Sequence, residues 1–382
     1  MKALTQRYIE TRQRTETLCK PLQIEDYTPQ SAIFSSPPKW HIAHVTWFFE
    51  EMILKNNVLG YKVFDDDFGF LFNSYYNSIG ERIERQNRGL LTRPKVEKIY
   101  EFRAYVDQAM INLLESTTDE NIITLGVLGI NHEQQHQELL ITDIKYTLSL
   151  NPLCPKLFEN NHVHHFNKST DWLKIPEGIY SIGHTTDDFC FDNELGAHRV
   201  FVESFEICSG LVTYGDFMAF IIDDGYKKPE FWLDEGWFWV NTNRLEHPLY
   251  WTHVDNQWQH YTLSGLEPID KNAILTHISF YEASAFAQWK GYRLPTEFEW
   301  EVASNQLNWG THWELTNSAY LPYPKFKTAK GAVGEYNGKF MINQMVLRGA
   351  SSITAPNHSR NTYRNFYHPQ MQWQFSGIRL AK

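Results

Sequence analysis

The chain has 382 residues, of which 42% are hydrophobic and 15% aromatic, so it can bury a substantial core in two domains or in one large domain. Its formal net charge is −10, which argues against nucleic acid or an anionic membrane surface as the main partner. The four cysteines have no C-x-x-C spacing, and neither an apolar signal sequence nor a run of about 18 apolar residues occurs, so we expect a cytoplasmic protein with free thiols and no membrane span.

Helical periodicity runs through roughly the first 150 residues. A first helix is expected over residues 3–19, and a second begins near Pro38, because proline suits the first turn of a helix. A third follows Pro94 with its apolar residues on one stripe, and a fourth runs from a capping box at 117–120 to about Ser149. Four helices in this length predict an up-and-down bundle, whose core is a common place for a metal site.

The fourth predicted helix carries the sequence NHEQQHQE at residues 131–138. His132 and His136 are four residues apart, so at about 100° per residue their imidazoles lie on one face, about 40° from each other. Two neutral imidazoles one turn apart can bind a divalent metal, and a third ligand must then come from another segment. His44 on the second helix is well placed for this and His41 is the competing candidate, although a histidine in an apolar stripe is more often a hydrogen-bonded core residue.

The same eight residues fit two catalytic patterns. One is H-E-x-x-H, in which Glu133 would be the general base of a zinc protease and Glu159 a downstream ligand. The other is H-x-x-x-H-x-E, which points to a different metal and chemistry. Glu138 lies about 200° from His136 round the helix, so it cannot easily bind the same metal and is expected to be structural, in contact with a neighbouring helix. Taken alone, the pattern favours the protease, and replacing Glu133 with alanine should inactivate only a protease.

Residues 61–93 form an aromatic and then a basic segment between the second and third helices. One interpretation is a long loop that is packed by its own rings and carries solvated arginines. The other is a lid that brings phenols and guanidinium groups to a pocket, since long loops in compact domains are often functional. The sequence leaves both interpretations open.

The pattern changes in the second half of the chain. Residues 156–170 are expected to be a linker, and residues 171–382 combine short β-like runs, such as 199–205, with glycine-rich turns and one clear helix over 281–289. We therefore expect an α+β protein, with a helical domain over residues 1–155 followed by the linker and an irregular domain over 171–382.

Five motifs are spread over the second half: Ile175-Pro176-Glu177-Gly178, Phe191-Asp192-Asn193-Glu194, RLPTEFEWE at residues 293–301, Leu347-Arg348-Gly349 and Ser376-Gly377-Ile378-Arg379-Leu380. Together they resemble the formylglycine-generating-enzyme-like (sulfatase-modifying factor) domain, which is related to C-type-lectin-like folds. The copper-dependent members of that fold use paired C-terminal cysteines. This chain has none beyond Cys208, so their chemistry is not expected.

The first half resembles a DinB-like helical bundle. Its combination with the second domain and the H-x-x-x-H-x-E pattern resembles the hercynine oxygenases, the sulfoxide synthases of ergothioneine biosynthesis. Further matching segments are SPPKWHIAH at residues 36–44, LFNSYY at 71–76, QNRGLLTRP at 86–94 and the YRNF and WQFSG motifs within 363–377.

This resemblance implies a non-haem Fe(II) centre whose ligands are His44, His132 and His136, and it favours His44 over His41. It also implies that Gln135 contacts the imidazole of a histidine-derived substrate. Asn365 and Phe366 are implied to bind the trimethylammonium and carboxylate end of that substrate, for which an aromatic face is suitable.

Two further pairs of residues follow from the resemblance. Tyr75 and Tyr76 match tyrosines that some members place beside the iron, where a phenol can pass a proton and so favour C–S bond formation over simple oxidation of the thiol. Arg82 and Arg85 are the candidates to bind the carboxylate of the sulfur donor, because guanidinium matches carboxylate as a bidentate partner.

The function that the resemblance implies is an O2-dependent reaction that joins the sulfur of cysteine to the imidazole ring of hercynine and gives the sulfoxide. Free cysteine is favoured because members that use γ-glutamylcysteine have an aspartate and an arginine where this chain has Tyr367 and Met371. The alternatives are γ-glutamylcysteine or a selenosugar as donor and unmethylated histidine as acceptor. A zinc protease, and a bundle with a lectin-like domain that only binds ligands, are more distant alternatives.

Overall fold

The computed structural model describes residues 2–74, 76, 80–159, 171–255, 257–328, 334 and 337–382. The chain divides into two compact units. The first unit contains Met1–Phe158 together with short segments of the C-terminal half, of which Ile353–His358 is fully described. The second unit contains most of the remaining chain. The predicted linker, residues 156–170, is described only as far as Glu159.

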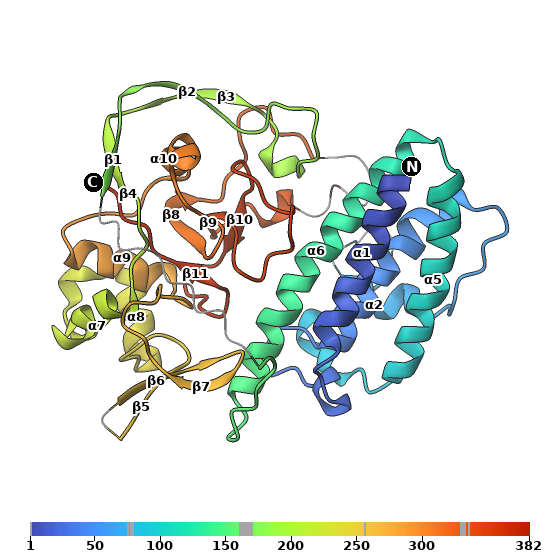
Figure 1. Ribbon diagram of the computed structural model, residues 1–382, viewed down its shortest axis with the longest axis horizontal. Coiled ribbons are helices and arrows are strands. Elements are labelled where there is room, and N and C mark those ends of the chain that lie inside the picture. The colour runs from blue at the N-terminus through green and yellow to red at the C-terminus, as the bar shows by residue number, and fades with distance from the viewer. Residues whose placement is uncertain are drawn as a thin grey trace. The chain divides into compact units, whose positions relative to one another are not determined.

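Among its described residues, the first unit is formed by four long helices, as predicted, and they run from blue to green in Figure 1. They are α1 (Lys2–Cys19), α2 (Pro38–Phe49), α5 (Val96–Ser116) and α6 (Glu120–Ser149). Both α1 and α2 pack against α5 and α6. All residues of α2 are buried, so this helix lies in the centre of the bundle and even its polar side chains must find partners there.

The predicted start of the second helix at Pro38 is confirmed, whereas the predicted start of the fourth helix differs. Helix α2 begins at Pro38 and continues through a π-helical turn, Glu50–Leu54, into α3 (Lys55–Asn57). The expected capping box at 117–120 is wrong, because the N-cap of α6 is Asp119, whose carboxylate accepts a hydrogen bond from the backbone N–H of Asn121 at 2.8 Å. A carboxylate there also interacts favourably with the positive end of the helix dipole.

The segment between α3 and α5 contains a short helix, α4 (Phe68–Leu71), and a 3-10 helix, Arg85–Leu90, among irregular residues. Hydrogen bonds from side chains of α2 hold this segment at two places. The Nζ of Lys39 donates hydrogen bonds to the carbonyl oxygens of Leu91 and Pro94 at 2.5 and 3.2 Å. The indole of Trp47 donates to the carbonyl of Gly69 at 3.1 Å.

In the part of the second unit that the structure describes, four small sheets combine with short helices, which confirms the predicted α+β class. The largest sheet has the order β10-β9-β8-β11, in which only β11 and β8 run parallel. Strands β1 and β4, and β2 and β3, form two antiparallel pairs, and β5, β6 and β7 form a meander. The strands are β1 (Trp172–Ile175), β2 (Gly178–Ile182), β3 (His198–Val202), β4 (Phe205–Cys208), β5 (Trp251–Val254), β6 (Gln257–Thr262), β7 (Gly265–Pro268), β8 (Trp313–Ala319), β9 (Met345–Gly349), β10 (Asn365–Tyr367) and β11 (Ser376–Gly377).

Helices α7 (Tyr214–Ile222), α8 (Asp234–Asn243), α9 (Phe280–Trp289) and α10 (Glu297–Ala303) complete the second unit. The helix predicted over 281–289 is α9, and the β-like run 199–205 is divided between β3 and β4. Helix α10 contacts β8 and β9, and an apolar cluster around its Trp300 includes Ile175, Phe205 and Ile207.

Buried ion pairs join the motif residues of the second unit. Arg348 pairs with Glu301, Arg364 with Glu297 at 2.8 Å, and Arg379 with Glu314 at 2.7 Å. Each of these arginines is buried. Because a buried charge without its partner costs about 3–5 kcal/mol, these motifs maintain the fold of the unit.

Among the residues that the structure describes, no helix combines the length and the apolar character needed to cross a membrane.

Candidate metal centre

Three buried histidines meet between α2 and α6. The nitrogen atoms that His44, His132 and His136 can offer to a metal lie within 4.8 Å of one another. His132 and His136 are one turn apart on α6, with ring centroids 4.7 Å apart, and His44 comes from α2, which packs on that face. The fold therefore brings the histidines of two helices together.

Several nitrogens of this cluster have no hydrogen-bond partner among the described residues. The Nδ1 of His44 lies 2.7 Å from the carbonyl oxygen of Phe72, which assigns the proton to Nδ1 and leaves Nε2 bare. The Nε2 of His44 and both ring nitrogens of His132 are buried without a partner in the described chain. An unsatisfied buried polar atom costs about 1–3 kcal/mol, so converging unsatisfied nitrogens fit a bound metal ion.

The three rings are neutral at physiological pH. Burial lowers the pKa of His132 to about 4. Burial also lowers the pKa of His44 and of His136 well below the ordinary value, and the neighbouring histidine charges act in the same direction. Neutral imidazole is the form that coordinates a metal, so the site is prepared for one without loss of protons from the ligands.

Aromatic side chains surround the three histidines. The ring of His44 stacks with Trp40 and with Trp47, at centroid distances of 4.5 and 5.4 Å and interplanar angles of 13° and 17°. Phe48 lies 4.9 Å from the ring of His132. These apolar walls restrict rotation of the histidine rings and keep the surroundings of the cluster poor in water.

His41 is hydrogen-bonded to His136 and lies outside the cluster of His44, His132 and His136. Its Nδ1 is 2.9 Å from the Nδ1 of His136, and its Nε2 is 3.1 Å from Oδ2 of Asp143. Burial lowers the pKa of His41, although Asp143 opposes that effect. Sequence reasoning considered His41 only as a competing ligand, and it did not identify Asp143, which lies two helical turns after His136.

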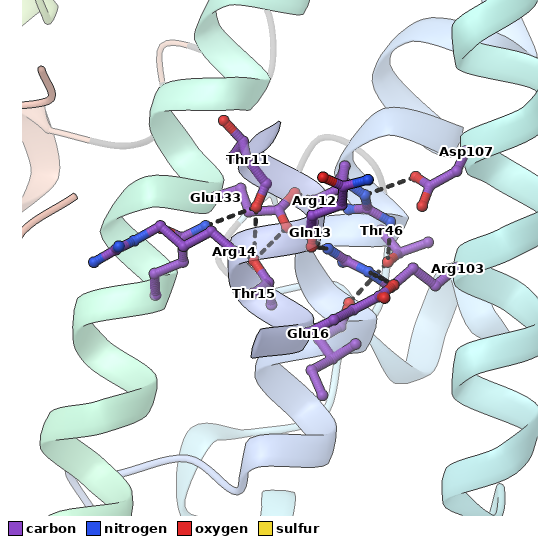
Figure 2. A network of polar contacts seen from close by, with 12 residues as sticks. Thr11, Arg12, Gln13, Arg14, Thr15, Glu16, Thr46, Arg103, Asp107 and Glu133 are labelled. Carbon is purple, nitrogen blue, oxygen red and sulfur yellow. Dashed lines mark hydrogen bonds and ion pairs between the residues drawn. The ribbon is translucent and has the colours of Figure 1, made fainter. Parts of the chain in front are cut away.

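Glu133, the presumed base of a protease, is held in a network of polar side chains (Figure 2). Its Oε2 accepts a hydrogen bond from Arg12 at 2.8 Å, and its Oε1 accepts from Arg103 and Thr15, each at 2.6 Å. Burial alone would raise the pKa of Glu133, but the charges of Arg103 and Arg12 outweigh it and lower the pKa to about 2. With both oxygens occupied, the carboxylate is not available to activate a water molecule at the histidines, and Glu159 is exposed and outside the cluster.

Two other polar residues of α6 contact the segment Ile353–His358 of the first unit. Glu138 accepts a hydrogen bond from the hydroxyl of Thr354 at 2.6 Å, and the amide oxygen of Gln134 lies 3.3 Å from Nδ1 of His358. The expected structural role of Glu138 agrees with this hydrogen bond, and Thr354 lies outside the helices, in a bend. The carboxylate that follows the H-x-x-x-H pattern thus makes a structural contact.

Tyr76 is buried in the aromatic layer that continues from His44. Its ring lies 5.5 Å from Trp47, and its backbone N–H donates to the side-chain oxygen of Asn73 at 3.3 Å. The same short segment includes Phe72, whose carbonyl accepts from His44. Tyr75 lies outside the described residues.

The two predicted donor-binding arginines contact backbone carbonyls. Arg82 donates to Ser74 at 2.8 Å, and the exposed Arg85 donates to Phe34 at 3.4 Å. A third arginine, Arg88, was missed even though it lies in the QNRGLLTRP motif. It is buried, with its guanidinium 3.4 Å above the ring of Trp40 and hydrogen bonds to hydroxyl groups of two serines, Ser36 and Ser74.

The remaining predicted substrate contacts are divided between the units. Gln135 is half-buried on α6, next to His136. Asn365 and Phe366 lie on β10 of the second unit, where Phe366 stacks on Tyr320 with centroids 4.1 Å apart. Their roles stay predictions.

Two family models match the chain. The model of the DinB superfamily matches residues 7–140, and the model of the sulfatase-modifying factor enzyme 1-like domain matches residues 158–312. These matches agree with the helical character of the first unit and the mixed character of the second.

Similar proteins include two bacterial oxygenases and a protein of Schizosaccharomyces pombe. The hercynine oxygenase of Mycolicibacterium smegmatis is 26% identical over 401 residues, and that of Mycobacterium tuberculosis is 26% identical over 399 residues. In both comparisons the match covers 91% of this chain and 91% of the relative. The ergothioneine biosynthesis protein 1 of Schizosaccharomyces pombe is 24% identical over 233 residues, which are 51% of this chain and 28% of that protein. The resemblance seen in the sequence motifs is thereby confirmed.

Proposed function

We propose that this chain, a relative of the hercynine oxygenases over 91% of its length, is itself an O2-dependent oxygenase of the ergothioneine pathway. The observation that carries the proposal is the buried cluster of His44, His132 and His136, whose nitrogens converge between α2 and α6. In this proposal residues 1–155 hold the metal and residues 171–382 contribute to substrate binding.

The metal in this proposal is Fe(II), held by Nε2 of His44 and by one nitrogen each of His132 and His136. Bound there, iron would supply open coordination positions and a redox-active ion able to pass electrons from the substrates to O2. Three imidazoles would suit zinc equally well, and the choice of iron rests on the relationship to oxygenases.

The proposed reaction joins hercynine and cysteine. The C–H bond of the imidazole ring and the S–H bond of cysteine break, a C–S bond forms, and the sulfur is oxidised to the sulfoxide. One oxygen atom of O2 enters the sulfoxide and the other leaves as water with the two hydrogens, so that O2 accepts all four electrons.

The side chains have separate tasks in this proposal. Trp40, Trp47 and Phe48 hold the ligand rings and exclude bulk water. Tyr75 or Tyr76 supplies the proton that directs the reaction to C–S bond formation.

Substrate binding is assigned to polar and aromatic groups beyond the ligands. Arg82 and Arg85 bind the carboxylate of cysteine. Gln135 contacts the imidazole of hercynine, and Asn365 and Phe366 bind its trimethylammonium and carboxylate end. Free cysteine is the proposed donor because Tyr367 and Met371 stand where γ-glutamylcysteine-dependent members have charged residues.

The test is a product analysis with defined substrates. Metal-free protein is loaded with Fe(II) without oxygen, mixed with hercynine and cysteine, and then exposed to O2. We expect O2 uptake and a product whose mass is that of both substrates plus one oxygen minus two hydrogens. γ-Glutamylcysteine and a selenosugar serve as competing donors, and histidine as a competing acceptor. Absence of O2 uptake by metal-loaded protein would contradict the proposal.

A further inference from the structure

We infer that His41 and Asp143 form a positioning pair that fixes the ring and the proton of the ligand His136, so that its Nε2 faces the metal. The inference rests on the proposed metal site and assigns a function to two side chains that are not ligands. Neither residue was needed to explain the three-histidine cluster itself.

The geometry is a continuous hydrogen-bonded chain between buried groups. His41 and Asp143 are 3% and 4% exposed. His41 bridges His136 and Asp143. Its Nδ1 lies 2.9 Å from Nδ1 of His136, and its Nε2 lies 3.1 Å from Oδ2 of Asp143. The same Oδ2 accepts a hydrogen bond from the backbone N–H of Ser36 at 2.7 Å.

The position of each ring proton follows from the carboxylate of Asp143, which ends the series of hydrogen bonds. Oδ2 of Asp143 accepts from the backbone N–H of Ser36 and, as a carboxylate oxygen, accepts from Nε2 of His41 as well, so this nitrogen carries the proton. The Nδ1 of His41 is then bare and must accept, which places a proton on Nδ1 of His136. His136 is thereby left with its lone pair on Nε2, the nitrogen that is not engaged by His41. This arrangement follows the general rule that a ligand histidine donates its second N–H to a neighbouring group.

The two helices that carry the metal ligands also carry this pair. His41 precedes His44 by about one turn of α2, and Asp143 follows His136 by about two turns of α6, so in each helix the two residues lie near the same face. Ser36, just before α2, joins the start of that helix to α6 through Asp143. The chain of hydrogen bonds therefore also fixes α2 relative to α6 at the metal centre.

The three ligands differ in what orients them. The backbone carbonyl of Phe72 orients His44, and no substitution of a side chain removes that carbonyl. His132 has no hydrogen-bond partner on either nitrogen among the described residues. Within the described chain, His136 is the ligand whose orientation depends on another side chain, which makes the inference accessible to mutagenesis.

The test measures metal affinity, because a merely structural role would change stability and leave affinity unchanged in the folded protein. Co(II) binding to metal-free protein is measured by calorimetry, well below the melting temperature of each variant. We expect His41→Phe and Asp143→Leu each to weaken Co(II) binding by about 10- to 100-fold. Asp143→Asn should retain most of the affinity, because its amide oxygen can accept from both Ser36 and His41.

A matched control is Glu138→Gln. Glu138 lies on the same helix as Asp143 but accepts its hydrogen bond from Thr354, outside the His136–His41–Asp143 hydrogen bonds, so the Co(II) affinity of this variant should equal that of the wild type. If the wild type does not bind Co(II), the proposed metal site itself fails. If the wild type binds and both His41→Phe and Asp143→Leu bind equally well, the site stands and the positioning pair is refuted.

A second measurement determines the protonation of the unsubstituted protein, and a variant serves only to assign its signals. Nitrogen-15 NMR of histidine-labelled, metal-free protein reports which ring nitrogen carries the proton, and the signals of His136 are identified by their loss in His136→Gln. We expect His136 to be protonated on Nδ1 and His41 on Nε2. Protonation of His136 on Nε2 would overturn the inference.

Discussion

The guanidinium of Arg103 donates a hydrogen bond to Oε1 of Glu133 at 2.6 Å, and both side chains are buried. Arg12 holds the other oxygen at 2.8 Å. The glutamate next to a candidate metal ligand is therefore the centre of a structural network that joins α1, α5 and α6. In this protein, the glutamate of the H-E-x-x-H pattern therefore stabilises the fold of the bundle and does not act as a general base.

Replacing Glu133 should destabilise the fold of the bundle. Glu133→Gln keeps the shape of the side chain but leaves the charges of Arg12 and Arg103 without this partner, so we expect a loss of about 3–5 kcal/mol in the free energy of unfolding, measured with urea. Glu133→Ala, which was expected to leave the activity of an enzyme other than a protease largely intact, should instead give little folded protein. Glu16→Gln is the control, because Glu16 also contacts Arg103 but is half exposed, and it should cost less than about 1 kcal/mol. A Glu133→Gln variant as stable as the wild type would refute the structural role.

The metal-free protein should tolerate the loss of His132. Leucine in place of His132 removes two buried nitrogens that have no partner among the described residues, and replacing such groups by an apolar side chain is neutral or stabilising. We therefore expect His132→Leu to abolish Co(II) binding while the melting temperature of the metal-free protein stays equal or rises. A fall of the melting temperature by more than about 5 °C, which corresponds to roughly 1–2 kcal/mol, would contradict this prediction.

The stability of the metal-free protein should depend on pH through the buried histidines. The pKa of His132 is about 4 in the folded state against an ordinary value of 6.5, so between these values the unfolded chain binds the proton and the folded chain does not. The free energy of unfolding therefore falls as the pH is lowered from 6.5 to 4, by up to about 1.4 kcal/mol per pH unit for this group. Urea unfolding at several pH values should show a shallower dependence in His132→Leu, and an unchanged slope would speak against the lowered pKa.

Loss of the Tyr76 hydroxyl should change the product more than the rate of O2 uptake. Tyr76 is buried beside Trp47, so Tyr76→Phe keeps the packing and removes only the proton donor. We expect turnover to shift from the sulfoxide of hercynine toward cysteine sulfinic acid, measured by mass spectrometry. Tyr105→Phe is the control, because Tyr105 is exposed and its hydroxyl donates to the carbonyl of Lys62. Tyr75→Phe tests the alternative donor, and unchanged product ratios in both single variants would remove the proposed role.

Local sequence pattern was sufficient for the four long helices described in the first unit and for the two histidines that share a face of α6. The period of an α-helix is set by backbone hydrogen bonds, so residues four apart share a face whatever surrounds them, and His132 and His136 could be placed together from spacing alone. The end of α6 near Ser149 and the position of α9 also followed from local signals. The capping residue of α6 did not, because Thr117 and Asp119 are both suitable and only the geometry of the turn selects Asp119.

Only the tertiary structure decided what the other polar residues of the bundle do. Which helix packs on each face of α6 determines that Glu133 meets Arg12 and Arg103, that His44 joins the histidine cluster, and that His41 lies between His136 and Asp143. These partners lie far apart in the sequence, and no local periodicity relates them. The sequence by itself determined that two histidines share a face. The packing of α1, α2 and α5 against α6 decided which side chains join His132 and His136, which orient them and which only stabilise the fold. The reason is that contacts between helices depend on how the surfaces of the helices fit together.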